Sequence, residues 1–197
     1  MLLLLLACAG GEDSAIPETL TCAERFTGDA PSTEADIVAL VESAREGFFP
    51  TMSEVSLEVV TMESDDSYFV ANLDLTTISE EPLERGYRVL YNPAMFADPP
   101  SSLAAGAILV HELKHVLDYT GMDSDELVEF GFWYASGDDI SEYEKQTDEY
   151  ALTSGCAEGL SAYREWVYAH IPAEDLEEKR DTYLTPEEIA AWVAANE

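Results

Sequence analysis

The sequence predicts an α+β fold, in which a small antiparallel sheet precedes a mostly helical C-terminal half. Alternating apolar residues favour strands between residues 55 and 91, whereas long proline-free runs with helical spacing dominate after residue 103. The chain has 197 residues, of which 47% are hydrophobic, and this is enough for one domain with its own core.

The first predicted element is a helix that begins after Ser32 or Thr33. Either side chain suits an N-cap, and the apolar residues that follow recur at helical spacing. We expect this helix to end near Gly47, before Pro50.

Three strands are predicted next. Residues 55–59 alternate between apolar and polar, and residues 68–76 are rich in β-formers after a turn at 64–67. These two segments are expected to pair in antiparallel fashion. A third extended run, residues 87–91, stops before Pro93 because proline cannot donate to a sheet ladder.

Helices are predicted for the rest of the chain. The longest is Leu103 to Tyr119, which is rich in alanine and leucine and is broken off by Gly121. A short helical stretch interrupted by glycines is expected from Asp123 or Ser124. Further helices are predicted at residues 140–154, at residues 157–170 and after the capping Thr185.

The charge balance excludes some partners. Against 41 Asp and Glu residues stand only 9 Lys and Arg, which gives a formal net charge of −32. Nucleic acid backbones and anionic membrane surfaces would repel such a chain. We therefore predict no nucleic acid partner, and we interpret the excess acid as a solvated surface.

The N-terminus reads MLLLLLACAGG and resembles the lipobox of bacterial lipoprotein signal peptides. That resemblance implies lipidation of Cys8, with the true start of translation lying upstream. The predicted organisation is then a signal remnant at residues 1–8, a flexible tether at 9–31 and a single domain at 32–197. The membrane would be contacted only through the lipid.

Two cysteines remain if Cys8 carries lipid. In an exported protein Cys22 and Cys156 could form a disulfide, but two unrelated thiols fit the sequence equally well.

The stretch LVHELKHVLDY carries the clearest chemical signal. His111 and His115 are four residues apart, so on a helix their rings can converge on one metal ion, with Glu112 beside them. Zinc suits imidazole nitrogen, and a catalytic zinc site needs three protein ligands and one open position. Two histidines are therefore insufficient.

A third ligand is available on the next long helix. Glu144 and Asp148 share a helical face, so Glu144 could reach the metal while Asp148 accepts a hydrogen bond from a ligand histidine. The alternative is a solvated acidic face, since this region is dense in acids. Asp118 is a second candidate acceptor for a ligand histidine.

HExxH followed by ExxxD resembles the gluzincin class of zinc metallopeptidases, over residues 87–151. The resemblance implies a zincin-like domain, with residues 87–91 as the substrate-binding edge strand and Glu112 as the general base of peptide hydrolysis. It also implies a His or Tyr that stabilises the oxyanion. Here His170 and Tyr150 are candidates, with two further tyrosines, Tyr163 and Tyr168, and no motif chooses among them.

The sequence thus predicts a monomeric, exported, lipid-anchored zinc metallopeptidase of the bacterial cell envelope, acting on peptides or proteins. One alternative is a non-catalytic envelope binding module with structural zinc or no metal, and another is a different hydrolase on the same metal site. Glu112 favours an enzyme, because a structural zinc site needs no base beside its first ligand. The aromatic residues at 130–134 are expected to pack in the core or cover the cleft.

Overall fold

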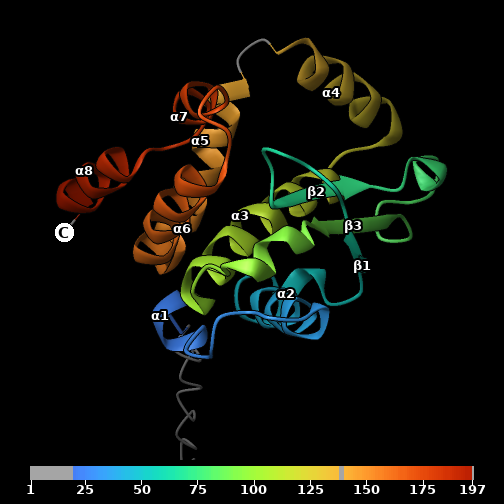
Figure 1. Cartoon of the computed structure of the whole chain (residues 1–197). Coiled ribbons are helices and arrows are strands. Elements are labelled where there is room, and N and C mark those ends of the chain that lie inside the picture. The colour runs from blue at the N-terminus through green and yellow to red at the C-terminus, as the bar shows by residue number, and fades with distance from the viewer. Residues whose placement is uncertain (1–19, 138–139, 197) are drawn as a thin grey trace, which may run out of the picture.

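The computed structural model describes residues 20–137 and 140–196 (Figure 1). They form an α+β fold with a three-stranded mixed sheet and a mostly helical remainder. The strands are β1 (Ser56–Thr61), β2 (Phe69–Leu73) and β3 (Gly86–Tyr91). The α-helices in the described residues are α1 (Cys22–Arg25), α2 (Glu34–Phe48), α3 (Ser102–Thr120), α4 (Ser124–Ser136), α5 (Ile140–Ala151), α6 (Ala157–His170), α7 (Leu176–Thr182) and α8 (Pro186–Asn196).

The sheet has the order β1-β3-β2, which corrects two predictions. The first two strands do not pair with each other. Instead β3 lies between them, parallel to β1 and antiparallel to β2. The run at 87–91 is therefore the central strand and not an edge strand. Alternation of apolar residues predicts that a segment is a strand, but it does not specify its neighbours, and this is why the pairing was wrong.

Helix α3 lies at the centre of the fold (Figure 1). It packs against α2 and β2 and, on another side, against α6. The approach of α6 depends on Gly159, since a Cβ there would lie 2.6 Å from the carbonyl oxygen of Leu103. Ser101 caps α3 by accepting a hydrogen bond from the Ala104 amide. The helix that carries the motif is thus held on several sides.

The helix predictions are largely confirmed. Thr33 caps α2, and α6 occupies 157–170 as expected. Helix α5 is shorter than predicted because a π-helical turn, Leu152–Cys156, follows it, with Gly155 in the left-handed region at φ 78°. Helix α4 continues through Gly131, and α7 was not predicted.

The N-terminal part of the described chain packs on the domain. Cys22 and Cys156 form a disulfide, and Phe26 is buried beside Gly106 of α3. The segment predicted as a tether, 9–31, therefore has a folded C-terminal part, which its polar composition concealed. Residues 1–19, with the predicted lipidation site Cys8, lie outside the described residues. Among the helices that are described, none is long and apolar enough to span a membrane.

Candidate metal centre

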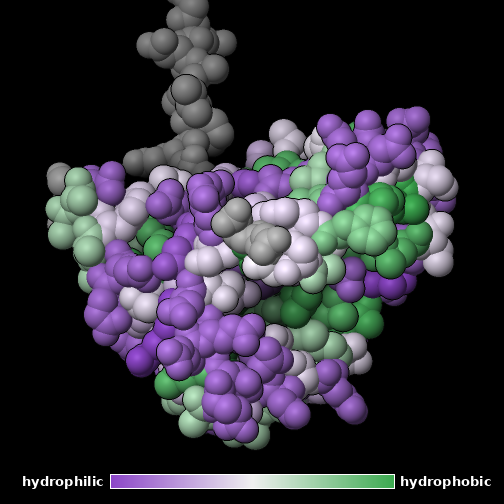
Figure 2. Space-filling model, turned by 90° about the horizontal axis from the view of Figure 1, so that it is seen from above, coloured by the Kyte–Doolittle hydropathy of each residue, from purple (hydrophilic) through white to green (hydrophobic). Residues whose placement is uncertain are grey.

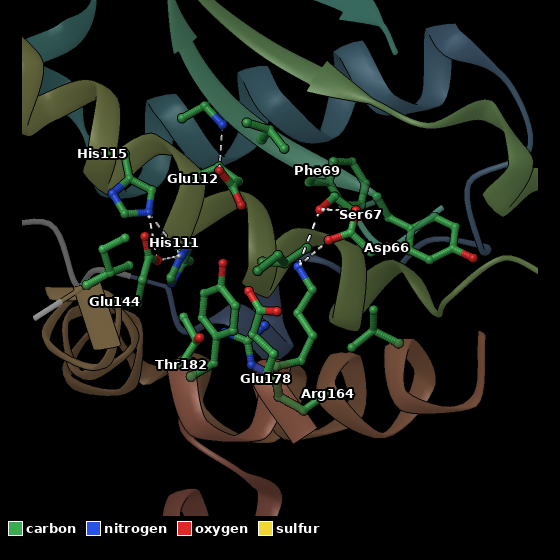
Figure 3. A pocket seen from close by; sticks show the side chains of 18 of the residues that line it. Asp66, Ser67, Phe69, His111, Glu112, His115, Glu144, Arg164, Glu178 and Thr182 are labelled. Atoms are coloured by element: carbon green, nitrogen blue, oxygen red, sulfur yellow. Dashed lines mark hydrogen bonds and ion pairs between the residues drawn. The ribbon is translucent and has the colours of Figure 1, made fainter. Parts of the chain in front are cut away.

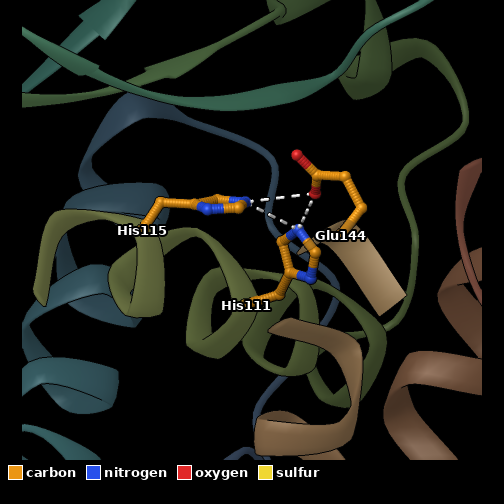
Figure 4. Close-up of side chains that lie close together, drawn as sticks. All are labelled: His111, His115 and Glu144. Carbon is orange, nitrogen blue, oxygen red and sulfur yellow. Dashed lines mark hydrogen bonds and ion pairs between the residues drawn. The ribbon is translucent and has the colours of Figure 1, made fainter. Parts of the chain in front are cut away.

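Three side chains from two helices converge at one buried point (Figure 4). His111 and His115 lie one turn apart on α3, and Glu144 comes from α5. The two Nε2 atoms are 3.1 Å apart, and Glu144 Oε2 lies 3.1 Å from His111 Nε2 and 3.2 Å from His115 Nε2. Both histidines and the glutamate are at least nine-tenths buried. The spacing prediction for these three residues agrees with this geometry.

This arrangement fits a metal ion. In a tetrahedral site with bonds of about 2.0–2.1 Å, ligand atoms lie about 3.3 Å from one another. The three separations here are close to that value. A buried group of two imidazoles and one carboxylate can therefore hold a metal.

The ring of His111 is oriented by a buried ionic network. Asp148 Oδ1 lies 2.8 Å from His111 Nδ1 and accepts a hydrogen bond of 2.7 Å from Arg164 Nη2. The other oxygen of Asp148 accepts a hydrogen bond from the backbone amide of Leu184. Asp148 thus lies beside the ring nitrogen of His111 that faces away from the other ligands, which is the position expected of the predicted acceptor.

The ring of His115 is held by a residue that the sequence analysis missed. His115 Nδ1 lies 2.9 Å from the hydroxyl of Tyr143, which in turn donates to Asp118 Oδ2 at 3.3 Å. Asp118 thus acts on His115 through Tyr143. The position of Tyr143 next to Glu144 on α5 was the only available signal.

The second oxygen of Glu144 also has a partner. Tyr134 of α4 donates a hydrogen bond of 2.9 Å to Glu144 Oε1. Burial raises the pKa of the Tyr134 hydroxyl, and the nearby Glu144 carboxylate raises it further, so Tyr134 remains a donor at neutral pH.

The charges around the centre favour a cation. Burial alone would lower the pKa of His111, but Asp148 and Glu144 outweigh it and raise this pKa to about 10. Burial acts to raise the pKa of Glu144, yet the hydrogen bonds and charges of the two histidines keep it below its usual range. In the metal-free protein a proton on His111 thus supplies positive charge that a metal would otherwise bring.

Glu112 lies beside the ligands and faces the sheet edge. Its Oε2 accepts a hydrogen bond of 2.6 Å from the backbone amide of Ala71 on β2. Residues 68 and 74 direct backbone groups toward β3, so the alternate residues Phe69 and Ala71 direct theirs outward. The edge strand next to the motif is therefore β2, in the place that the sequence analysis gave to residues 87–91.

The group opens into a pocket of about 550 Å³ (Figure 3). Its walls come from β2 and the preceding loop, from α3, from the start of α5 and from α6 and α7. Figure 3 shows the three ligands at one side, Asp66 and Ser67 at the other, and Glu112 between them. The base candidate thus borders a space large enough for a peptide segment.

The two preferred oxyanion candidates are occupied elsewhere. His170 contacts the carbonyl of Trp166 and the carboxylate of Asp98, and Tyr150 donates to the carbonyl of Phe48. Neither is among the residues that line the pocket. Two alternatives, Tyr163 and Tyr168, do line it, as does Tyr183, which the sequence analysis missed.

Tyr183 lies directly against the metal group. Its ring centroid is 5.9 Å from that of His111, and the guanidinium carbon of Arg164 lies over the Tyr183 ring at 4.3 Å from its centroid. It occupies this place because the next residue, Leu184, donates its amide to Asp148. No local sequence pattern signals such a contact.

Comparison with protein-family models, with curated proteins and with solved structures found no match to this chain. The function is therefore inferred from the geometry of the site.

Proposed function

We propose that this protein is a zinc-dependent peptidase with a zincin-like domain of gluzincin type. The observation that carries the proposal is the convergence of His111, His115 and Glu144 in a pocket where Glu112 meets the outward-facing amide of Ala71. A metal, a base and an outward-facing strand edge are the three parts that hydrolysis of an extended peptide requires.

Zinc is the metal that this ligand set favours. Two imidazole nitrogens argue against calcium and magnesium, which prefer oxygen ligands. In the described residues the compact group contains three protein ligands, which matches a catalytic zinc site with a fourth position for water or substrate. A closed structural site would need a fourth protein ligand, and Cys22 and Cys156 are held in a disulfide.

The chain's own residues supply the proton transfers. Bound zinc would lower the pKa of water and polarise a carbonyl. Glu112 takes a proton from the attacking water and later gives it to the leaving amine. The outward edge of β2 positions the substrate backbone, and Tyr183, which lies against His111, is the candidate to stabilise the developing negative charge.

We further propose that the protein is exported and anchored by lipid at Cys8. The disulfide between Cys22 and Cys156 supports the first part, because such bonds persist in oxidising compartments.

The first test is the metal content of the purified protein, measured by elemental mass spectrometry. We expect about one zinc per chain, as three converging ligands imply, and loss of that zinc in a His111→Ala/His115→Ala double variant. Absence of metal in the wild type, even after zinc is added back, would refute the metal centre.

The second test separates an enzyme from a binding module. Glu112→Gln should keep the zinc and lose hydrolysis of a peptide library, because the amide cannot act as a base. Glu144→Ala should weaken zinc binding itself. A wild-type protein that holds zinc but cleaves no peptide would favour the non-catalytic module.

A further inference from the structure

The pocket has two chemically different ends (Figure 3). One end holds the three metal ligands, and the other is formed by α6, α7 and the loop before β2. Arg164, Tyr168 and Lys179 line this second end. Of these three residues, Arg164 also belongs to the metal centre through Asp148, whereas Lys179 contacts the segment before β2.

At the second end, Lys179 of α7 contacts the loop before β2 on the opposite side of the pocket. Lys179 Nζ lies 3.3 Å from Asp66 Oδ2 and 3.4 Å from Ser67 Oγ. This bridge joins α7 to the segment that leads into β2. An extended chain lying along β2 would meet it just beyond Phe69.

Two buried polar atoms at this end have no partner within the described residues. They are Arg164 Nε and Tyr168 Oη, which lie one helical turn apart on α6. Arg164 is only 4% exposed, and its guanidinium carries five donors, of which Nη2 serves Asp148. Buried donors without acceptors are costly, so this end is suited to an acceptor supplied by a ligand.

The direction of β2 indicates which end of a substrate arrives there. Antiparallel pairing is the more common way to extend a sheet. A peptide antiparallel to β2 runs from Leu73 toward Phe69, so its C-terminus points to the bridge. Ser67 is four residues from Ala71, a span of at most about 14 Å, which holds no more than about four peptide residues.

We propose that the second end binds the C-terminal carboxylate of the substrate, so that the enzyme releases short C-terminal fragments rather than cutting within long chains. Lys179, Arg164 and Tyr168 supply the donors, and a carboxylate is the acceptor that matches two cationic groups and a hydroxyl. Glu178 also lines this end, but its side chain is exposed and screened by solvent. The inference rests on the proposed peptidase function.

Paired peptides test the proposal on the zinc-loaded protein. Each pair has the same sequence and differs only in a free or an amidated C-terminus. We expect amidation to lower kcat/KM about tenfold or more, the usual effect of losing a hydrogen bond to a charged group. Mass spectrometry of the products should show fragments of no more than about four residues. Equal cleavage of both forms, or cuts far from the C-terminus, would overturn the proposed carboxylate subsite.

Two variants locate the effect. Lys179→Met removes the ammonium group and Tyr168→Phe removes one hydroxyl, and each should reduce the preference for the free acid. Lys145→Met is the matched control, since this lysine pairs with Glu188 and does not line the pocket. An unchanged preference in both pocket variants would contradict the proposed subsite.

A binding measurement distinguishes failure of this inference from failure of the proposed function. Calorimetric titration of the Glu112→Gln protein with the same peptide pairs requires no turnover. Tighter binding of the free acid than of the amide, reduced by Lys179→Met, would support the carboxylate subsite even if the wild type cleaves nothing. Equal binding of the two forms would refute the subsite even in an active peptidase.

Discussion

The floor and the roof of the metal centre are built differently. The floor consists of the ligands on α3 and α5 with Asp148 and Arg164, all of them buried, and of the half-buried Tyr143. Each of these side chains contacts another member. The roof is α4, Ser124–Ser136, which exposes 76% of Phe132 and 44% of Val128. Its Phe130, Trp133 and Tyr134 contact Tyr143 of the floor.

The difference indicates that the floor and the roof have separate roles in the site. A buried network of ion pairs fixes ligand positions, because each side chain has few alternative places for its charge. The roof is joined to the floor mainly by aromatic contacts and by the hydrogen bond from Tyr134 to Glu144. Figure 2 looks down on this part of the molecule and shows hydrophobic surface on α4 beside a hollow. Variants in the floor should therefore lower the stability and the zinc affinity of the protein far more than variants in the roof.

Asp148→Asn should give the largest effect. The substitution leaves the buried Arg164 without its carboxylate and removes the charge beside His111. We expect the free energy of unfolding of the metal-free protein to fall by about 3 kcal/mol, as for other broken buried ion pairs. Zinc affinity should fall about 10–100-fold. Urea unfolding and a competitive zinc titration measure the two effects.

The matched control is Asp98→Asn. Asp98 pairs with His170 at the surface, where ion pairs contribute little to stability. If both variants lost the same stability, the floor would not be the rigid part of the site.

Zinc binding should release a proton at neutral pH. In the metal-free protein Asp148 and Glu144 raise the pKa of His111 to about 10, so His111 is protonated at pH 7, whereas zinc needs the neutral ring. The affinity for zinc should therefore rise about tenfold per pH unit through the neutral range and fall as the pH is lowered. Calorimetry in buffers of different ionisation enthalpy counts the protons released. No proton release at pH 7 would show that the floor is not charged in this way.

The metal ligands and Asp148 could be predicted from the sequence, but Arg164, Tyr143 and much of what surrounds them could not. His111, His115, Glu144 and Asp148 follow helical spacing, and spacing along a helix is a local property. Tyr134 and Tyr183 reach the centre through the placement of α4 and through the Leu184 amide, and these are tertiary contacts without local periodicity.

In the sheet, too, local features could be predicted from the sequence and tertiary ones could not. The β-forming segments at 55–59, 68–76 and 87–91 located three strands, although the second strand ends earlier, at Leu73. Strand order depends on which surfaces α2 and α3 cover, so the edge position of β2 was not predictable from any one segment.

A pair of hydroxyl deletions compares floor and roof, because each hydroxyl lies 2.9 Å from a ligand side chain. Tyr143→Phe removes the partner of His115, and Tyr134→Phe removes the partner of Glu144. We expect about a tenfold loss of zinc affinity for Tyr143→Phe, within the usual range for such partners, and about threefold for Tyr134→Phe. The roof hydroxyl should matter less because α4 can shift and admit water to Glu144. Competitive titration with a zinc indicator compares them, and a larger loss for Tyr134→Phe would reverse the assignment of floor and roof.

The smallest effect is expected on the outer face of the roof. Phe132→Ser should leave the free energy of unfolding within about 0.5 kcal/mol of the wild type, because an exposed side chain loses little contact on truncation. Leu127→Ala on the same helix should cost about 2 kcal/mol, because Leu127 is buried with 7% exposure. Urea unfolding of both variants tests whether α4 is attached through its inner face alone. A cost for Phe132→Ser equal to that of Leu127→Ala would mean that the outer face is also packed, and the roof would then be as constrained as the floor.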